Sequence, residues 1–206
     1  MRNLEDLAAD IDGYTLTPYL VKNGKNKVFW LFTMGDNDYE ICYTYEMRKN
    51  HPFLLDFENL GINYDYNYSE NFSENIYGPT NNPANILLDS RMNALGTFTG
   101  TRRYRVGANG TPEPTENYYE INTDFEMTVT APFSGKKIDE SGKSSGNYSV
   151  KPGDKFRVVR TDNRSWIDAK VNGKNLVRFD YDNSFYPNTL DGKDESTLFD
   201  FLPYAG

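Results

Sequence analysis

Short polar turns recur along this sequence, and each separates two segments rich in β-branched and aromatic residues. Asn23-Gly24 lies between segments 18–22 and 27–33, and Asn-Gly is typical of the two-residue turns of antiparallel hairpins. Asn172-Gly173 separates two similar segments near the other end of the chain. These turns predict an all-β protein built from antiparallel hairpins.

The composition favours the same fold class. Of the 206 residues, 37% are hydrophobic and 15% aromatic, including 16 Tyr and 13 Phe. A tyrosine ring covers apolar surface while its hydroxyl reaches water, which suits a strand that is buried on one side only. This composition favours sheets with wide aromatic surfaces over a helical bundle.

Residues 1–124 are predicted to form a hairpin-rich antiparallel meander, for which a propeller-like arrangement is one option. The expected strands there begin with 18–22, 27–33 and 39–47. Within residues 48–85, the stretch 63–73 alternates Tyr with polar residues, and Gly and Pro then break the chain over 78–83. The alternation is compatible with a strand that has one aromatic face, but 63–73 lacks a bulky aliphatic partner face, so much of 48–85 is expected to form a long surface loop.

Residues 125–206 are predicted to fold as a small SH3-like β-barrel. A Gly-, Ser- and Lys-rich loop is expected over 134–147, followed by strands joined by turns of two to three residues. Along the strand that starts at Trp166, side chains alternate between the two faces of the sheet. One face carries Ile167, Ala169 and Val171, and the other carries Trp166, Asp168 and Lys170.

Charge and residue usage limit the partners and cofactors. The net charge of -8 repels phosphate backbones and anionic lipids, so neither nucleic acid nor a membrane surface is an expected partner. No segment approaches the roughly 20 apolar residues of a membrane-spanning helix. The single cysteine excludes a disulfide framework. Asp10-Ile11-Asp12-Gly13 begins like a calcium loop but lacks the later ligands, so no metal or cofactor is expected.

The sequence contains no strong catalytic motif. His51 is the only histidine, and Cys42, the only cysteine, lies within a predicted strand rather than at a helix N-terminus, which would lower the pKa of its thiol. No Gly-x-Ser-x-Gly motif accompanies them. The chain is therefore not expected to be an enzyme, although its abundant carboxylates leave a glycoside hydrolase as an alternative.

Aromatic side chains are the better candidates for binding. Trp166 shares its predicted face with Asp168 and lies close to Arg164, and planar rings with polar neighbours stack on sugars and peptides. The alternative for Trp166 is core packing. A second candidate surface is the row Tyr64, Tyr66 and Tyr68, whose alternative is a solvated edge.

One basic cluster, Arg102-Arg103-x-Arg105, stands out in this acidic protein. On a strand, Arg103 and Arg105 share one face. We expect these arginines to pair with acids such as Glu116 and Glu120 across a hairpin rather than to bind phosphate.

The segment KPGDKFRVVRTDNRSWIDAKVNGKNLVRFDYD, residues 151–182, resembles bacterial SH3-like modules. Segments 18–47, 91–121 and 198–206 are similar to secreted lipoproteins of gut Firmicutes, in which an SH3-like module follows a β-rich region. The resemblance implies export, and anchoring through a segment upstream of residue 1. The chain is accordingly expected to be an excised ectodomain on a Gram-positive cell surface.

Three functions follow as hypotheses. The first is a non-catalytic extracellular domain of a bacterial surface that binds cell-wall or host glycan or peptide. The second is a structural or assembly spacer of a larger lipoprotein with no ligand of its own. The third is a glycoside hydrolase that uses carboxylates.

Overall fold

The computed structural model describes residues 15–23, 26–34, 40–48, 51–59, 84–108, 110 and 112–204. Within them the regular elements are β-strands and a single 3-10 turn, and the paired strands are antiparallel. The all-β prediction is confirmed. No helix among these residues is long and apolar enough to cross a membrane.

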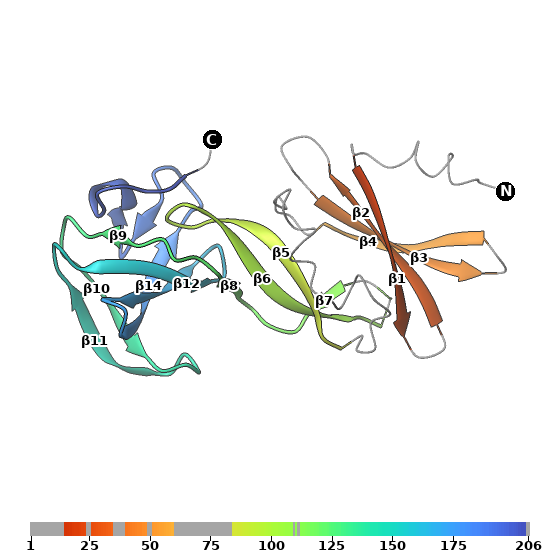
Figure 1. Ribbon diagram of the computed structural model, residues 1–206, viewed down its shortest axis with the longest axis horizontal. Coiled ribbons are helices and arrows are strands. Elements are labelled where there is room, and N and C mark those ends of the chain that lie inside the picture. The colour runs from red at the N-terminus through yellow and green to blue at the C-terminus, as the bar shows by residue number, and fades with distance from the viewer. Residues whose placement is uncertain are drawn as a thin grey trace. The chain divides into compact units, whose positions relative to one another are not determined.

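The chain divides into two compact units (Figure 1). The first contains residues 1–91 and 102–116, and the second contains 92–101 and 117–206. The sequence predicts a boundary between two domains at 124/125, which is not where the two compact units divide. The units are defined by contacts within the fold, so the predicted domain boundary stays a prediction.

The first unit contains a four-stranded antiparallel sheet in the order β1-β2-β3-β4. Neighbouring strands in the sheet are also neighbours in the chain. The strands are β1 (Thr15–Asn23), β2 (Asn26–Met34), β3 (Glu40–Arg48) and β4 (His51–Asn59).

The strand β4 corrects the loop predicted over 48–85, which is wrong for residues 51–59 and for Arg48, the last residue of β3. The strand extends the preceding hairpin, with Arg48 opposite His51. Pro52 near its start is tolerated because β4 is an edge strand, where a residue without an N–H group removes no hydrogen bond from the sheet. The rest of that predicted loop that precedes Ala84 lies outside the described residues.

In the second sheet the strands are hydrogen-bonded in the order β11-β10-β14-β13-β12-β8-β6-β5. Both β5 (Ile86–Asn93) and β6 (Thr97–Val106) continue into residues assigned to the first unit, where β6 also pairs with β7 (Pro112–Pro114). The described pairs do not join β5 back to β11, so this order is open. The remaining elements are β8 (Tyr119–Ile121), β9 (Met127–Thr128), β10 (Phe133–Ile138), β11 (Ser144–Val150), β12 (Lys155–Thr161), β13 (Trp166–Val171), β14 (Asn175–Asp182), β15 (Thr189–Leu190), β16 (Lys193–Asp194) and the 3-10 turn η2 (Glu195–Thr197).

The loop predicted over 134–147 is also wrong, because most of it forms the hairpin β10–β11. Gly135 lies within β10, and a Cβ atom there would stand 2.6 Å from the carbonyl oxygen of Arg178 and 2.7 Å from the Phe179 ring. Gly135, which is typical of a loop in the sequence, is therefore needed because β10 approaches β14 too closely for a side chain.

Aromatic rings fill the core of the second unit. The Phe156 ring lies 5.2 Å from that of Phe179 and 5.0 Å from that of Phe199, and Phe133 contacts all three rings. The predicted apolar face of β13 is confirmed, since Ile167, Ala169 and Val171 are fully buried. Aromatic pairs in such tilted and edge-to-face arrangements add to the stabilisation from apolar burial.

Candidate functional site

The turn before β13 fixes the position of Trp166. The Asp162 carboxylate accepts hydrogen bonds from the backbone N–H groups of Arg164, Ser165 and Trp166 at 2.7–3.0 Å, and from the Ser165 hydroxyl. Burial acts to raise the pKa of Asp162, but these donors outweigh it and hold the pKa below its ordinary value. The turn is thus held by a charged carboxylate at the start of the strand.

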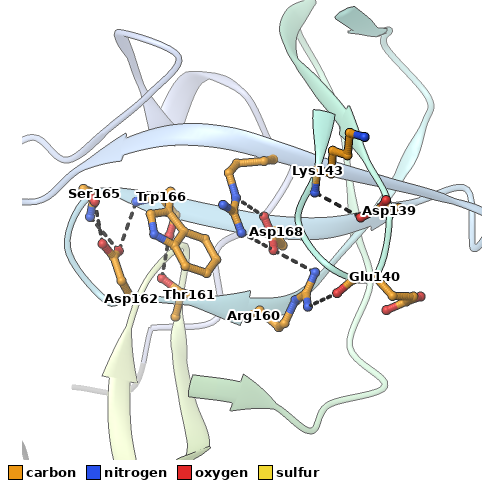
Figure 2. A network of polar contacts seen from close by, with 10 residues as sticks. Asp139, Glu140, Lys143, Arg160, Thr161, Asp162, Ser165, Trp166 and Asp168 are labelled. Carbon is orange, nitrogen blue, oxygen red and sulfur yellow. Dashed lines mark hydrogen bonds and ion pairs between the residues drawn. The ribbon is translucent and has the colours of Figure 1, made fainter. Parts of the chain in front are cut away.

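On the face of the sheet opposite the buried Ile167, Ala169 and Val171, three charged side chains lie at paired positions of neighbouring strands (Figure 2). Asp168 on β13 stands between Arg160 on β12 and Arg178 on β14. Its two oxygens accept from Arg178 Nε at 2.7 Å and Nη2 at 2.9 Å, and Arg160 Nη2 lies 3.1 Å from Oδ2. Asp168 is fully buried, so both arginines are needed to compensate its charge.

Aromatic rings flank the two guanidinium groups. The Arg178 guanidinium stacks on Trp166, 3.8 Å from the ring centroid, and the Arg160 guanidinium lies 5.5 Å from the Tyr118 ring centroid. The Tyr118 and Trp166 rings are themselves 6.4 Å apart. We call these five residues, Tyr118, Arg160, Trp166, Asp168 and Arg178, the arginine cluster. The hydrogen bond to Asp168 raises the pKa of Arg178, which keeps it charged.

The β10–β11 turn lies over this cluster (Figure 2). Arg160 Nη1 donates to the Glu140 carbonyl oxygen at 2.9 Å, and a Cβ atom on Gly142 would stand 3.5 Å from Arg178 Nη2. Trp166 is half-buried, with one ring face under Arg178. Trp166 and Asp168 therefore make their principal contacts within the domain, and the prediction that they also contact a ligand stays a prediction.

The other predicted binding residues are not part of this cluster. Arg164 is exposed at the tip of the β12–β13 turn, and its guanidinium makes no hydrogen bond or ion pair with another described residue. Tyr64, Tyr66 and Tyr68 lie outside the described residues, as do Asp10 and Asp12. Among the residues that are described, no three His, Cys, Asp or Glu side chains are grouped to hold a metal ion.

A second surface, which the sequence analysis missed, lies on the loop between β14 and β15. We call residues 183–188 the aromatic loop. Phe185 is 83% exposed and Tyr186 is 96% exposed, and they are the most exposed of the large hydrophobic side chains described. The signal available in the sequence was an aromatic pair flanked by the turn-forming residues Asn183-Ser184 and Pro187-Asn188.

Hydrogen bonds hold both ends of the aromatic loop. Asn183 Nδ2 donates to the Asn163 carbonyl oxygen at 2.9 Å, which ties the loop to the turn that carries Arg164. At the other end, Asn188 Nδ2 donates to Glu195 Oε1 at 3.0 Å and to the Tyr204 hydroxyl at 3.1 Å. The exposed rings are therefore carried by a loop whose ends are fixed.

Glu195 is the buried acid of this anchor, with 5% of its surface exposed. The Tyr204 hydroxyl donates to its Oε1 at 2.6 Å, whereas its Oε2 is buried without a hydrogen-bond partner among the described residues. Burial raises the pKa of Glu195 above its ordinary value, against the smaller opposing effects of Tyr204 and Asn188. Burial, with the nearby carboxyl, also raises the pKa of Tyr204 to about 12.

Comparison with known proteins gives no match: neither a protein-family model, nor a curated protein, nor a solved structure resembles this chain at a significant level.

Proposed function

We propose that this protein is a non-catalytic extracellular domain of a bacterial surface that binds cell-wall or host glycan through the aromatic loop. The observation that carries the proposal is the exposure of Phe185 and Tyr186 on a loop whose ends are anchored. Single exposed apolar side chains are common on protein surfaces, whereas neighbouring large apolar side chains that are exposed together are more typical of an interaction site.

The chemistry around these rings suits a sugar. Aromatic faces stack on the C–H faces of pyranose rings, and nearby polar groups then orient the hydroxyls. Asp180 and Asp182 are exposed on the strand that leads into the loop, and Arg164 is exposed on the turn to which the loop is tied. A loop that is already ordered loses less conformational entropy when it binds.

The SH3-like architecture of the second unit is also part of this proposal. Its support is the run of antiparallel neighbours β12, β13 and β14 around one aromatic core, together with the resemblance of residues 151–182. Export and anchoring on the cell surface are proposed from the resemblance alone. A peptide is the other class of ligand that exposed aromatic rings would accept.

The test is retention of the full chain on insoluble peptidoglycan and on immobilised mucin glycans at low salt. We expect retention by the wild type, and loss of most of it in a Phe185→Ala, Tyr186→Ala double variant. Phe201→Ala is the matched control, because it removes another exposed aromatic ring, 60% exposed, outside the loop. Equal retention of the double variant and the control would overturn the assignment of the loop.

A structural spacer is the second candidate. It is favoured by the way in which Trp166 and Asp168 are used inside the domain rather than on an open surface. Absence of retention on every glycan and peptide tested, with no thermal shift of unfolding, would support the spacer and contradict the binding proposal.

A further inference from the structure

The anchor of the aromatic loop contains a buried carboxyl group, that of Glu195, which forms no ion pair with any described residue. Glu195 begins the 3-10 turn η2, and its backbone N–H donates to the Asn188 carbonyl oxygen at 3.1 Å. Its side chain receives hydrogen bonds from Asn188 and Tyr204, both neutral donors. Among the described residues no Lys, Arg or His forms an ion pair with it.

The groups that face Glu195 come from four places. Tyr181 on β14 lies close enough to interact with the carboxyl, while its hydroxyl donates to the Asn93 carbonyl oxygen at 3.2 Å. Tyr204 approaches from the C-terminal segment and Asn188 from the aromatic loop. Asp194, the preceding residue, adds a negative charge that disfavours ionisation of Glu195.

This surrounding favours a neutral carboxylic acid. An ionised carboxylate with one buried oxygen unpaired is costly, because burial removes its hydration and none of the described cations replaces it. Its described hydrogen-bond donors are neutral, and the charge that acts on it, that of Asp194, has the same sign. An ionised Glu195 accepts stronger hydrogen bonds from Tyr204 and Asn188, but the burial penalty is larger. Ionisation therefore favours exposure of the carboxylate to water, which loosens the arrangement that joins η2, Tyr204 and the end of the loop.

We propose that Glu195 is the positioning residue of the aromatic loop, that it holds the loop as a neutral acid, and that its ionisation loosens the loop as pH rises. The inference rests on the proposed function for its biological meaning, since it makes presentation of Phe185 and Tyr186 dependent on pH. A domain of this kind binds its ligand better in an acidic environment than in an alkaline one.

The experiment is a pH series of backbone ¹⁵N NMR relaxation on the full chain without ligand. In the wild type we expect the heteronuclear NOE values of Ser184, Phe185 and Tyr186 to be high in acid and to fall as pH rises. In Glu195→Gln, which keeps the shape of the neutral acid, we expect high values throughout. Glu140→Gln, at an exposed side chain far along the sequence, is the matched control and is expected to behave as the wild type does.

A second variant tests the direction of the effect. The hydrogen bond from Tyr204 favours the ionised form of Glu195, so Tyr204→Phe is expected to move the loosening of the loop to higher pH. Loop relaxation that does not change with pH in the wild type, or that changes equally in Glu195→Gln, would overturn the proposal. Because no ligand is present, either result leaves the glycan-binding test to be decided separately.

Discussion

Two carboxyl groups are buried among the described residues of the second unit, and their surroundings differ. Asp168 lies between two guanidinium groups that stack on aromatic rings, whereas Glu195 contacts neutral donors and has one unpaired oxygen. The first is paired with two cations in the middle of a sheet. The second is suited to a proton, beside a loop that carries exposed rings. A buried carboxyl group thus holds neighbouring strands together at Asp168, whereas at Glu195 it makes the hold on a loop dependent on pH.

The largest expected effect comes from removing the charge of Asp168. Asp168→Asn leaves two largely buried arginines without their carboxylate, and breaking a buried pair in this way costs about 3 kcal/mol or more. Urea denaturation of the full chain measures the change in the free energy of unfolding. Asp180→Asn, at an exposed position on the neighbouring strand, is the control and should change it by less than about 0.5 kcal/mol. Equal effects of the two variants would show that the arginine cluster contributes little.

A smaller loss is expected from Arg178→Lys. Lysine keeps the charge but loses the two-point contact with Asp168 and the stacking on Trp166, which together are worth about 1–2 kcal/mol at a partly exposed site. The same denaturation experiment measures it. Lys136→Arg, opposite Arg178 on β10, should leave stability unchanged. If Arg178→Lys left the free energy of unfolding unchanged, a positive charge opposite Asp168 would be sufficient without the two-point contact and the stacking.

Glu195→Gln should stabilise the protein in a manner that depends on pH. Because the pKa of Glu195 is raised in the folded state, the folded state binds more protons than the unfolded state once pH exceeds the ordinary carboxyl pKa. The stability supplied by the protonated acid is present below that pKa and is lost as pH rises through the raised one. The difference in melting temperature between variant and wild type should therefore grow from acid to neutral pH. A difference that is constant with pH would exclude a titrating Glu195.

The smallest effect on stability is expected from substitutions in the aromatic loop, although these should reduce glycan binding the most. Phe185→Ala and Tyr186→Ala remove side chains that are almost wholly in water, so each should change the free energy of unfolding by less than about 0.5 kcal/mol. Thermal unfolding measures this. A loss above about 1 kcal/mol would show that the rings are packed in solution, and the loop would no longer be a candidate binding surface.

The period-two pattern of β13 correctly separated Trp166 and Asp168 from the apolar face, because alternation depends only on the strand itself. The arginines that pair with Asp168 could not be predicted from the sequence. A bulge in β12 places Val158 opposite Ala169 and Arg160 opposite Asp168, so Val159 is skipped. Nothing in the residues of β12 indicates where such an extra residue falls, and without it Asp168 would face a valine.

Local pairing was easier to predict than the position of buried acids. The sequence predicted that the arginines of β6 pair with nearby acids, and Arg103 Nε indeed lies 3.3 Å from Glu116 Oε1. Glu195 gave no such indication, since an acid followed by Ser and Thr looks like an ordinary surface turn. Its burial depends on Tyr204 and Asn188, which only the folded chain brings together.

The most direct test of the contrast between the two buried acids is a ¹³C NMR titration of the side-chain carboxyl of Glu195, assigned by comparison with Glu195→Gln. The account predicts a midpoint above the ordinary glutamate value of 4.5, with chemical shifts in the aromatic loop changing over the same pH range. A midpoint at or below 4.5 would show that Glu195 is an ordinary charged carboxylate, and would contradict the account.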